Sequence, residues 1–354
     1  MSSSDTAPHV ELEQLRAATA APSWVQRGYT LEKNHTHVLL AALNSSKQQE
    51  TRRLAAALWN LGSGSKIQAE QITKVAATRE HSLKQGEHSK VDLFIAVDLG
   101  GDSRQLAVEV KVDGSPSNRQ LTSMAEALGH DPRRELVLLT LGAAQSSRIE
   151  PEGYAPAAIK RWTVADMLGL GELVVAASPV PAEAQAWLAE LEREEVRRKL
   201  AWTAEAALQG CGFRERLMHA YRYGEAAKAL QTSNAQWEVS LQRHGVVLHG
   251  KSSHREVPGT TVTLYLEVAD RTLRVKAGAW HDDSDARAAA EPLCPLITQV
   301  LVARGFSVKA SKRSPGSSVT LLSIDPDAPD WPRDAFIDRL RRVHAAWEEV
   351  PWQA

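Results

Sequence analysis

The sequence has 354 residues, of which 43% are hydrophobic and 24% are charged, and its formal net charge is −1. This balance predicts a largely globular chain with room for two domains, and it excludes a mostly disordered protein. The near-neutral charge gives no general positive field toward a polyanion, although a local basic surface would still be compatible with nucleic-acid binding.

The two cysteines, Cys211 and Cys294, lie far apart in the sequence and lack CxxC spacing. A disulfide scaffold and a zinc ribbon are therefore disfavoured. The chain has no apolar run of about 18 residues, and no apolar segment follows a basic N-terminus. We expect a protein of the reducing cytoplasm, with neither a transmembrane helix nor a signal peptide.

The first 145 residues alternate between helical and strand-like patterns. An arm over 1–27 contains one short helix, VELEQLRAATAA. Two longer helical patterns follow, the first beginning near Thr30 and the second ending at Gly62. The next predicted elements are a strand over 71–83, two strands within 90–112 joined by a Gly-Gly turn, a helix over 115–130, and an apolar strand over 135–142.

The later part of the chain changes its pattern twice. After a short strand and a helix over 157–170, the proline-rich stretch SPVPAEAQ predicts a domain boundary near 175–182. Charged helices are expected up to about residue 230. Beyond Thr232 we expect strands over 237–250, 260–270 and 271–280, a helix over 285–305, two more strands, and a closing helix over 330–350.

These patterns predict four segments and a mixed α/β fold. The expected segments are an N-terminal arm over 1–27, an α/β domain over 28–175, a helical connector over 176–232, and a C-terminal α+β domain over 233–354.

The hairpin predicted within 90–112 brings three charged side chains together. Side chains alternate between the two faces of a strand, so Glu109 and Lys111 point the same way, about 6.6 Å apart along the strand. A turn centred near residue 101 sets Asp92 roughly opposite residue 110, within one position of both. An acidic cluster with one lysine is therefore expected on this sheet.

This group of residues suits a particular chemistry. Two neighbouring carboxylates repel each other, and one becomes neutral unless a cation lies between them. Mg²⁺, with Mn²⁺ as a possible substitute, takes oxygen ligands and keeps several waters. An adjacent ammonium can orient or help deprotonate a water, or stabilise charge on a phosphoryl oxygen. The pattern favours metal-assisted hydrolysis of a phosphodiester.

A simpler interpretation is a surface ion pair on a half-exposed strand, because charged residues are common in any chain. Three features favour a functional site instead. The acidic residue Asp92 stands in register one strand earlier, both strands have a strongly apolar opposite face, and the flanking elements follow the order helix, three strands, helix, strand.

At residues 28–145 the sequence resembles the PD-(D/E)XK nuclease superfamily, whose core has the order αβββαβ. Its signature is an Asp on the second strand and Glu-x-Lys on the third, matched here by VDL around Asp92 and by EVK over 109–111. Val91 stands where many members have proline. The succession of ExNH, RE, VDL, EVK and RQL is especially similar to a bacterial branch of restriction- and defence-type nucleases.

The resemblance implies roles for the residues of the signature. Asp92 and Glu109 would bind the metal, with the backbone carbonyl of Val110 as an additional ligand. Lys111 would handle the attacking water.

Three further residues match less general parts of the family pattern. Glu80, in RE on the first strand, would assist with the metal or the water, and Gln120, in NRQL, would position the site or the substrate. Glu32 matches an acidic residue that some members carry on the leading helix. Ordinary roles remain open: an ion pair with Arg79 for Glu80, an interaction with the helix dipole for Glu32, and an exposed helical amide for Gln120.

The expected function is therefore Mg²⁺-dependent cleavage of nucleic acid, DNA in preference to RNA, in prokaryotic defence against foreign DNA. Basic residues near the site are candidate phosphate contacts: Lys84, Lys90, Arg119, Lys160 and Arg161. The C-terminal domain would select the substrate, bind a protein partner, or support a homo-oligomer, and no membrane contact is expected.

Two alternatives stay open. An RNase effector would use the same metal chemistry, and recognition of the 2′-OH leaves no short sequence motif. A catalytically silent relative would bind nucleic acid or act as a scaffold.

Overall fold

The computed structural model describes residues 31–83, 90–114, 118–129, 131–146, 159–203, 215–231, 236–242, 245–269, 271–279, 285–311, 318–325 and 332–352. The chain divides into two compact units, residues 1–145 with 149–213, and residues 146–148 with 214–354. Each unit combines a sheet with helices, so the prediction of a mixed α/β fold is confirmed. The helix expected within 1–27 lies outside the described residues. Among the described helices, none has both the length and the apolar character needed to span a membrane.

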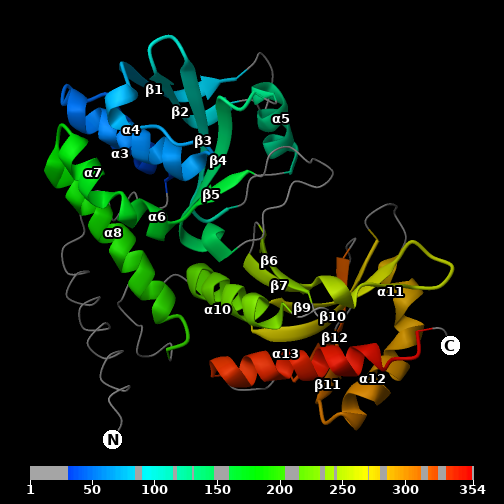
Figure 1. The fold of residues 1–354 in the computed structure, drawn as a ribbon. Coiled ribbons are helices and arrows are strands. Elements are labelled where there is room, and N and C mark those ends of the chain that lie inside the picture. The colour runs from blue at the N-terminus through cyan, green and yellow to red at the C-terminus, as the bar shows by residue number, and fades with distance from the viewer. Residues whose placement is uncertain are drawn as a thin grey trace, which may run out of the picture. The chain divides into compact units, whose positions relative to one another are not determined.

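The first unit is built on a five-stranded sheet in the order β1-β2-β3-β4-β5 (Figure 1). The first three strands are antiparallel neighbours, whereas β4 and β5 run parallel to β3. A parallel neighbour requires a crossover, which α5 (Asn118–Leu128) provides between β3 and β4. The strands are β1 (Lys74–Ser82), β2 (Lys90–Asp98), β3 (Ser103–Lys111), β4 (Arg134–Thr140) and β5 (Lys160–Trp162).

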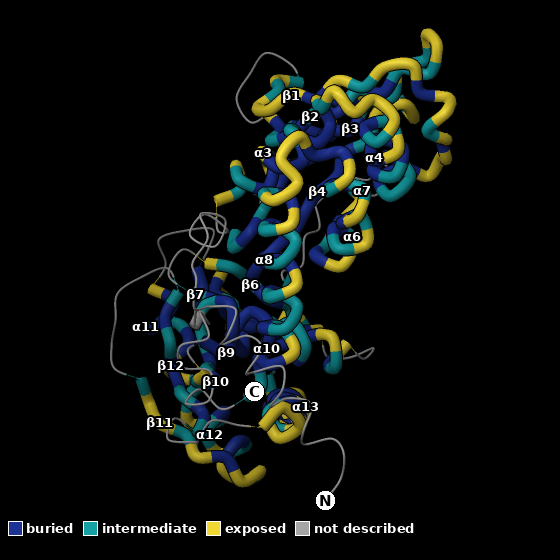
Figure 2. The backbone as a smooth tube through the Cα atoms, turned by 90° about the vertical axis from the view of Figure 1, so that its left-hand side faces the viewer, coloured by how far each residue is buried: buried dark blue, intermediate teal, exposed yellow. Residues whose placement is uncertain are grey.

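Helices cover both faces of this sheet (Figure 2), so β3 and β4 are buried over most of their length, whereas buried and partly buried residues alternate along β2. On one face, Leu106 and Val108 of β3 pack in a core with Trp59 and Trp187. On the other face, Ala107 packs with residues of α5. The helices on the larger core are α3 (Glu32–Leu43), α4 (Gln48–Gly62), α6 (Val164–Gly169), α7 (Gly171–Ala177) and α8 (Pro181–Lys199).

The beginning of β2 departs from the predicted alternation. Leu93, Ile95 and Val97 share the larger core as expected, but Val91 packs with Ala107 under α5. The ladder between β2 and β3 starts only at Leu93, so the first residues of β2 pair with β1 alone. At this end of β2, Val91 therefore lies on the α5 face and not in the larger core.

The second unit is built on a seven-stranded antiparallel sheet, with the path β11-β12-β10-β9-β7-β6 and β8 paired to β9. Its strands are β6 (Trp237–Gln242), β7 (Gly245–Gly250), β8 (Arg255–Glu256), β9 (Thr263–Ala269), β10 (Thr272–Gly278), β11 (Val308–Ala310) and β12 (Ser318–Ile324). Its helices are α10 (Glu215–Leu230), α11 (Ala286–Ala290), α12 (Cys294–Ala303) and α13 (Arg333–Glu348).

Two predictions for this unit are wrong in detail. The single strand expected over 237–250 is the hairpin of β6 and β7, in which Trp237 pairs with Gly250. The single helix expected over 285–305 is interrupted after Ala290, and α12 begins at Cys294. Prolines 292 and 295 lack a backbone N–H, so they suit the first turn of a new segment better than the middle of one helix.

The helical connector predicted over 176–232 does not form a separate segment. Trp187 and Leu191 of α8 are buried in the core of the first unit. In contrast, α10 packs on β6 and β7 of the second unit. The division follows burial, because each helix has an apolar face that requires a sheet to cover it.

Directly after β4, the backbone at Gly142 passes close to the residues that follow β3. Gly142 has φ +53°, and a Cβ there would lie 2.6 Å from the carbonyl oxygen of Val112 and 2.6 Å from Asp113 Oδ1. We expect Gly142→Ala to lower the free energy of unfolding by about 1–3 kcal/mol, because both the left-handed backbone and the close contacts oppose a side chain.

Urea denaturation of Gly142→Ala and Gly100→Ala tests this prediction. Gly100 also has a positive φ, +77°, but nothing lies within 4 Å of a Cβ built there. Gly100→Ala therefore reports the backbone cost alone, and an equal loss of stability in both variants would contradict the close approach at Gly142.

Candidate active site

The charged residues predicted from the hairpin meet at the C-terminal end of β3. Glu109 is 3% exposed, and its Oε1 lies 2.7 Å from Lys111 Nζ. Lys111 Nζ also lies 3.2 Å from Glu32 Oε2. The prediction that Glu109 and Lys111 share one face of the strand is confirmed, and one ammonium bridges two carboxylates there.

Asp92 reaches the same place from β2. Its Oδ2 accepts a hydrogen bond of 2.8 Å from the backbone N–H of Val110. The ladder between the two strands stops at Leu93, so the carboxylate takes the place of a backbone partner for β3. The last pair of the β2–β3 ladder joins Leu93 and Val108. One step further along, Asp92 lies opposite Glu109, whereas the sequence predicted that it lies opposite residue 110.

Gln120 completes the site from the first turn of α5. Its Nε2 donates a hydrogen bond of 2.7 Å to Glu109 Oε1, the same oxygen that faces Lys111. Both contacts hold the Glu109 side chain in one orientation. The crossover from β3 into α5 therefore places Gln120 beside the strand that carries Glu109 and Lys111.

Glu32 is the first residue of α3 and joins the site through Lys111. The alternative of a simple interaction with the helix dipole is compatible with this contact, because a first-turn carboxylate can make both. Glu32 therefore belongs to the cluster. The sequence linked Glu32 to the site only through the family resemblance.

Glu80 lies apart from these contacts. In the ladder with β2, the neighbours Arg79 and His81 are paired, so Glu80 lies opposite Asp92. The backbone of Glu80 is nevertheless irregular, with a φ of 51°. A left-handed backbone redirects the side chain away from the regular alternation. The Glu80 side chain is 65% exposed, and its ion pair is with Arg79, at 3.7 Å. The structure thus shows the ion pair that the sequence left open for this residue.

Burial governs the charges of the cluster. It raises the pKa of Glu109 to about 7, Asp92 adds to the effect, and Lys111 opposes it. Burial also raises the pKa of Glu32, again against Lys111. For Lys111, burial lowers the pKa, but the neighbouring carboxylates outweigh burial and the net pKa is raised. Lys111 therefore stays protonated near neutral pH. Its single positive charge is shared by several carboxylates and cannot neutralise all of them.

A hard divalent cation fits this set of donors. Asp92 and Glu109 offer two carboxylates from adjacent strands, and mutual repulsion contributes to the raised pKa of Glu109. In the described parts of the chain, no group of three or more His, Cys, Asp or Glu side chains forms a ready metal cage. Mg²⁺ is usually held by one or two carboxylates and keeps several waters, so it matches a pair of this kind.

One of the candidate phosphate contacts is anchored beside the cluster. Arg161 donates hydrogen bonds to Thr140 Oγ1 at 2.9 Å and to the Ala144 carbonyl at 2.7 Å. Thr140 is the partner of Lys111 in the parallel ladder of β3 and β4. Sequence reasoning missed Thr140, whose signal was a hydroxyl at the end of an otherwise apolar strand. Three other candidates are exposed, Lys90, Arg119 and Lys160, and Lys84 lies outside the described residues.

Comparison of the chain with protein-family models, with curated proteins and with solved structures finds no match.

The raised pKa of Glu109 predicts a pH dependence of stability in the absence of metal. The folded state binds this proton more tightly than the unfolded chain, whose pKa is near 4.5, so the stabilisation is complete below pH 4.5. It is lost as the pH rises through about 7. Glu109→Gln does not show this loss, because its side chain does not titrate. From pH 5 to pH 8 its free energy of unfolding should therefore rise by on the order of 2 kcal/mol relative to that of the wild type.

Urea denaturation in EDTA at both pH values measures this difference. Glu126→Gln, an exposed position on α5, is the matched control and should follow the wild type. A wild type that gains stability from pH 5 to pH 8 relative to Glu109→Gln would refute the prediction.

Proposed function

We propose that this chain is a metal-dependent nuclease that hydrolyses phosphodiester bonds in nucleic acid. The observation that carries the proposal is the Lys111 ammonium held between Glu109 and Glu32, next to Asp92. Two acids and a lysine on adjacent strands form the PD-(D/E)XK signature that the sequence resembles. The helices α3 and α4, followed by β1, β2, β3, α5 and β4, support the same assignment, because leading helix, three strands, helix and strand is the order of the αβββαβ core.

Asp92 and Glu109 would hold Mg²⁺, with the Val110 carbonyl as a further oxygen. When bound, the ion would lower the pKa of a water and withdraw charge from a phosphoryl oxygen. The protein fixes both carboxylates beforehand, Asp92 through the Val110 N–H and Glu109 through Gln120. Such fixed ligands reduce the reorganisation that cofactor binding requires.

Lys111 acts as a cation in this proposal. Because its pKa is raised, it donates hydrogen bonds to an attacking water or to a phosphoryl oxygen, where negative charge develops. Glu32 is the carboxylate that remains outside the metal pair. Since burial raises its pKa, Glu32 is suited to accept the proton that the water gives up.

DNA is the favoured substrate because the resemblance is to restriction- and defence-type nucleases, and the proposed setting is the prokaryotic cytoplasm. Arg161 supports a nucleic-acid substrate, because its guanidinium is held next to the partner position of Lys111. RNA shares the same phosphodiester chemistry, so substrates of both kinds belong in the test.

A cleavage assay with purified protein and Mg²⁺ or Mn²⁺ tests the proposal. The substrates are supercoiled and linear duplex DNA, single-stranded DNA and RNA. We expect metal-dependent cleavage that falls at least about a hundredfold in Lys111→Ala and in Asp92→Asn. Lys111→Ala removes the cation that would face the reacting phosphate, and Asp92→Asn removes a carboxylate that would hold the metal ion. Lys74→Ala, an exposed lysine at the start of β1 that pairs with Asp98, should retain most of the activity.

Calorimetric titration with Mg²⁺ accompanies the assay. Binding that disappears in Asp92→Asn is expected. Absence of both cleavage and Mg²⁺ binding in the folded wild type would overturn the proposal, as would cleavage that is equal in the wild type and in both site variants.

A second experiment distinguishes the roles of Glu32 and Glu80. Glu32→Gln should lower the single-turnover rate at least about tenfold, because Lys111 loses one of its two carboxylate partners. Glu80→Gln should stay within about twofold of the wild type, since Glu80 pairs with Arg79 outside the cluster. A larger loss in Glu80→Gln than in Glu32→Gln would contradict the arrangement.

A further inference from the structure

The second unit ends its sheet with a short edge strand. β11 is the last strand on the path, and among the described residues β12 is the only strand that pairs with it. An edge strand has backbone groups on its outer side that can pair with another chain.

The hydrogen bonds of β11 show which groups point outward. Just after β11, the N–H of Ser311 donates to the Leu321 carbonyl of β12 at 2.8 Å. Just before β11, the carbonyl of Ser307 accepts from the N–H of Asp325, the residue that follows β12, at 2.7 Å. Bonded positions alternate along an antiparallel strand, so Lys309 also faces β12. The N–H and C=O groups of Val308 and Ala310 therefore point away from β12.

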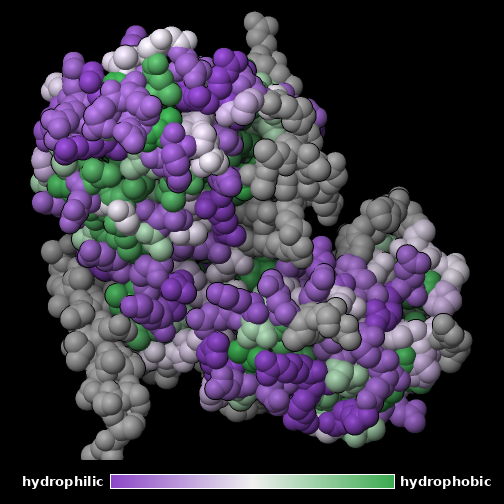
Figure 3. Space-filling view, viewed as in Figure 1, coloured by the Kyte–Doolittle hydropathy of each residue, from purple (hydrophilic) through white to green (hydrophobic). Residues whose placement is uncertain are grey.

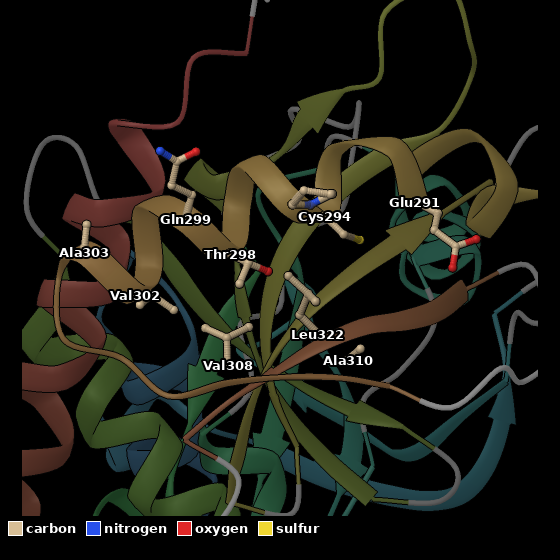
Figure 4. A pocket seen from close by; sticks show the side chains of 10 residues that line it. Glu291, Cys294, Thr298, Gln299, Val302, Ala303, Val308, Ala310 and Leu322 are labelled. Atoms are coloured by element: carbon tan, nitrogen blue, oxygen red, sulfur yellow. The ribbon is translucent and has the colours of Figure 1, made fainter.

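An apolar groove of about 830 Å³ lies between this edge and α12 (Figure 4). Residues spaced by four along α12 lie on one face of the helix and line one wall. The groove is lined by Cys294, Thr298 and Val302 from α12, and by Val308, Ala310 and Leu322 from the strands. Val302 is 54% exposed, whereas hydrophilic side chains predominate over the surface seen in Figure 3.

We propose that β11 and α12 together bind an extended peptide segment of a partner protein, which adds to the sheet as a further strand. The outward N–H and C=O groups would bond its backbone, and the groove would receive its apolar side chains at alternate positions. This inference concerns the second unit alone and is independent of the proposed nuclease activity.

The charges around β11 indicate the chemistry of the partner. Lys309 is exposed, and alternation places its side chain on the opposite face from Val308 and Ala310. A cross-strand neighbour of Lys309 is favoured when it is acidic. Among the described residues that line the groove, Glu291 is the one with a charge, so acidic side chains are disfavoured there. The segment therefore alternates apolar residues with Asp or Glu.

The same lysine argues against a second copy of this chain as the occupant. Antiparallel pairing of two β11 strands about residue 309 would set two Lys309 side chains directly opposite each other. A lysine on an edge strand is a common device against such self-pairing.

Selection from a phage-displayed library of random heptapeptides against the full-length protein tests the proposal. Counter-selection uses Ala310→Pro, which removes one outward N–H and leaves the bonds between β11 and β12 in place. We expect enrichment of peptides that alternate apolar and acidic residues. A synthetic peptide from the enriched set, measured by fluorescence polarisation, should bind Ala310→Pro at least tenfold more weakly than the wild type.

Two further variants complete the test. Val302→Glu should also weaken binding about tenfold. If circular dichroism shows that Ala310→Pro does not fold, Val302→Glu serves as the groove variant in its place. Lys309→Glu should exchange the preference for acidic peptides for basic ones. No enrichment, or equal binding by the wild type and the folded groove variants, would overturn the proposal. A dimer in sedimentation that Val302→Glu or Ala310→Pro abolishes would overturn it in favour of a second copy.

Discussion

A carboxylate buried in a sheet needs a cation beside it, and Glu109 obtains one from Lys111, two residues further along the same strand. Several elements of the first unit meet at this pair. Glu32 brings the start of α3 to the ammonium, and Gln120 brings the start of α5 to the carboxylate. Elements that are distant in the sequence therefore meet at the end of β3, where they share the charges of one ion pair.

The cluster is stable in the fold yet incompletely neutralised, and its chemistry follows from that imbalance. Burial and Asp92 keep the pKa of Glu109 near 7, at a point where it changes charge close to physiological pH. A bound divalent cation would remove the repulsion between the two acids. If the site binds a metal ion as proposed, the same arrangement would link protonation, metal binding and folding stability.

The two units use their sheets in different ways. In the first, helices cover both faces and the ends of adjacent strands carry the polar groups. In the second, the edge strand β11 and the apolar wall of α12 lie side by side and leave a groove. If both proposals hold, the reactive site and the recognition surface belong to different units of the chain.

The sequence alone predicted the elements whose patterns are local. Strand alternation put Glu109 and Lys111 on one face, and the Gly-Gly turn set Asp92 within one position of its observed place, because both depend only on backbone period and turn length. Tertiary structure decided what depends on neighbours distant in the sequence. It brought Glu32 to Lys111, it gave α8 and α10 to different cores, and it turned Glu80 toward Arg79 through a left-handed backbone that no residue pattern signals. Contacts of this kind arise from packing and from local strain, which a sequence period does not encode.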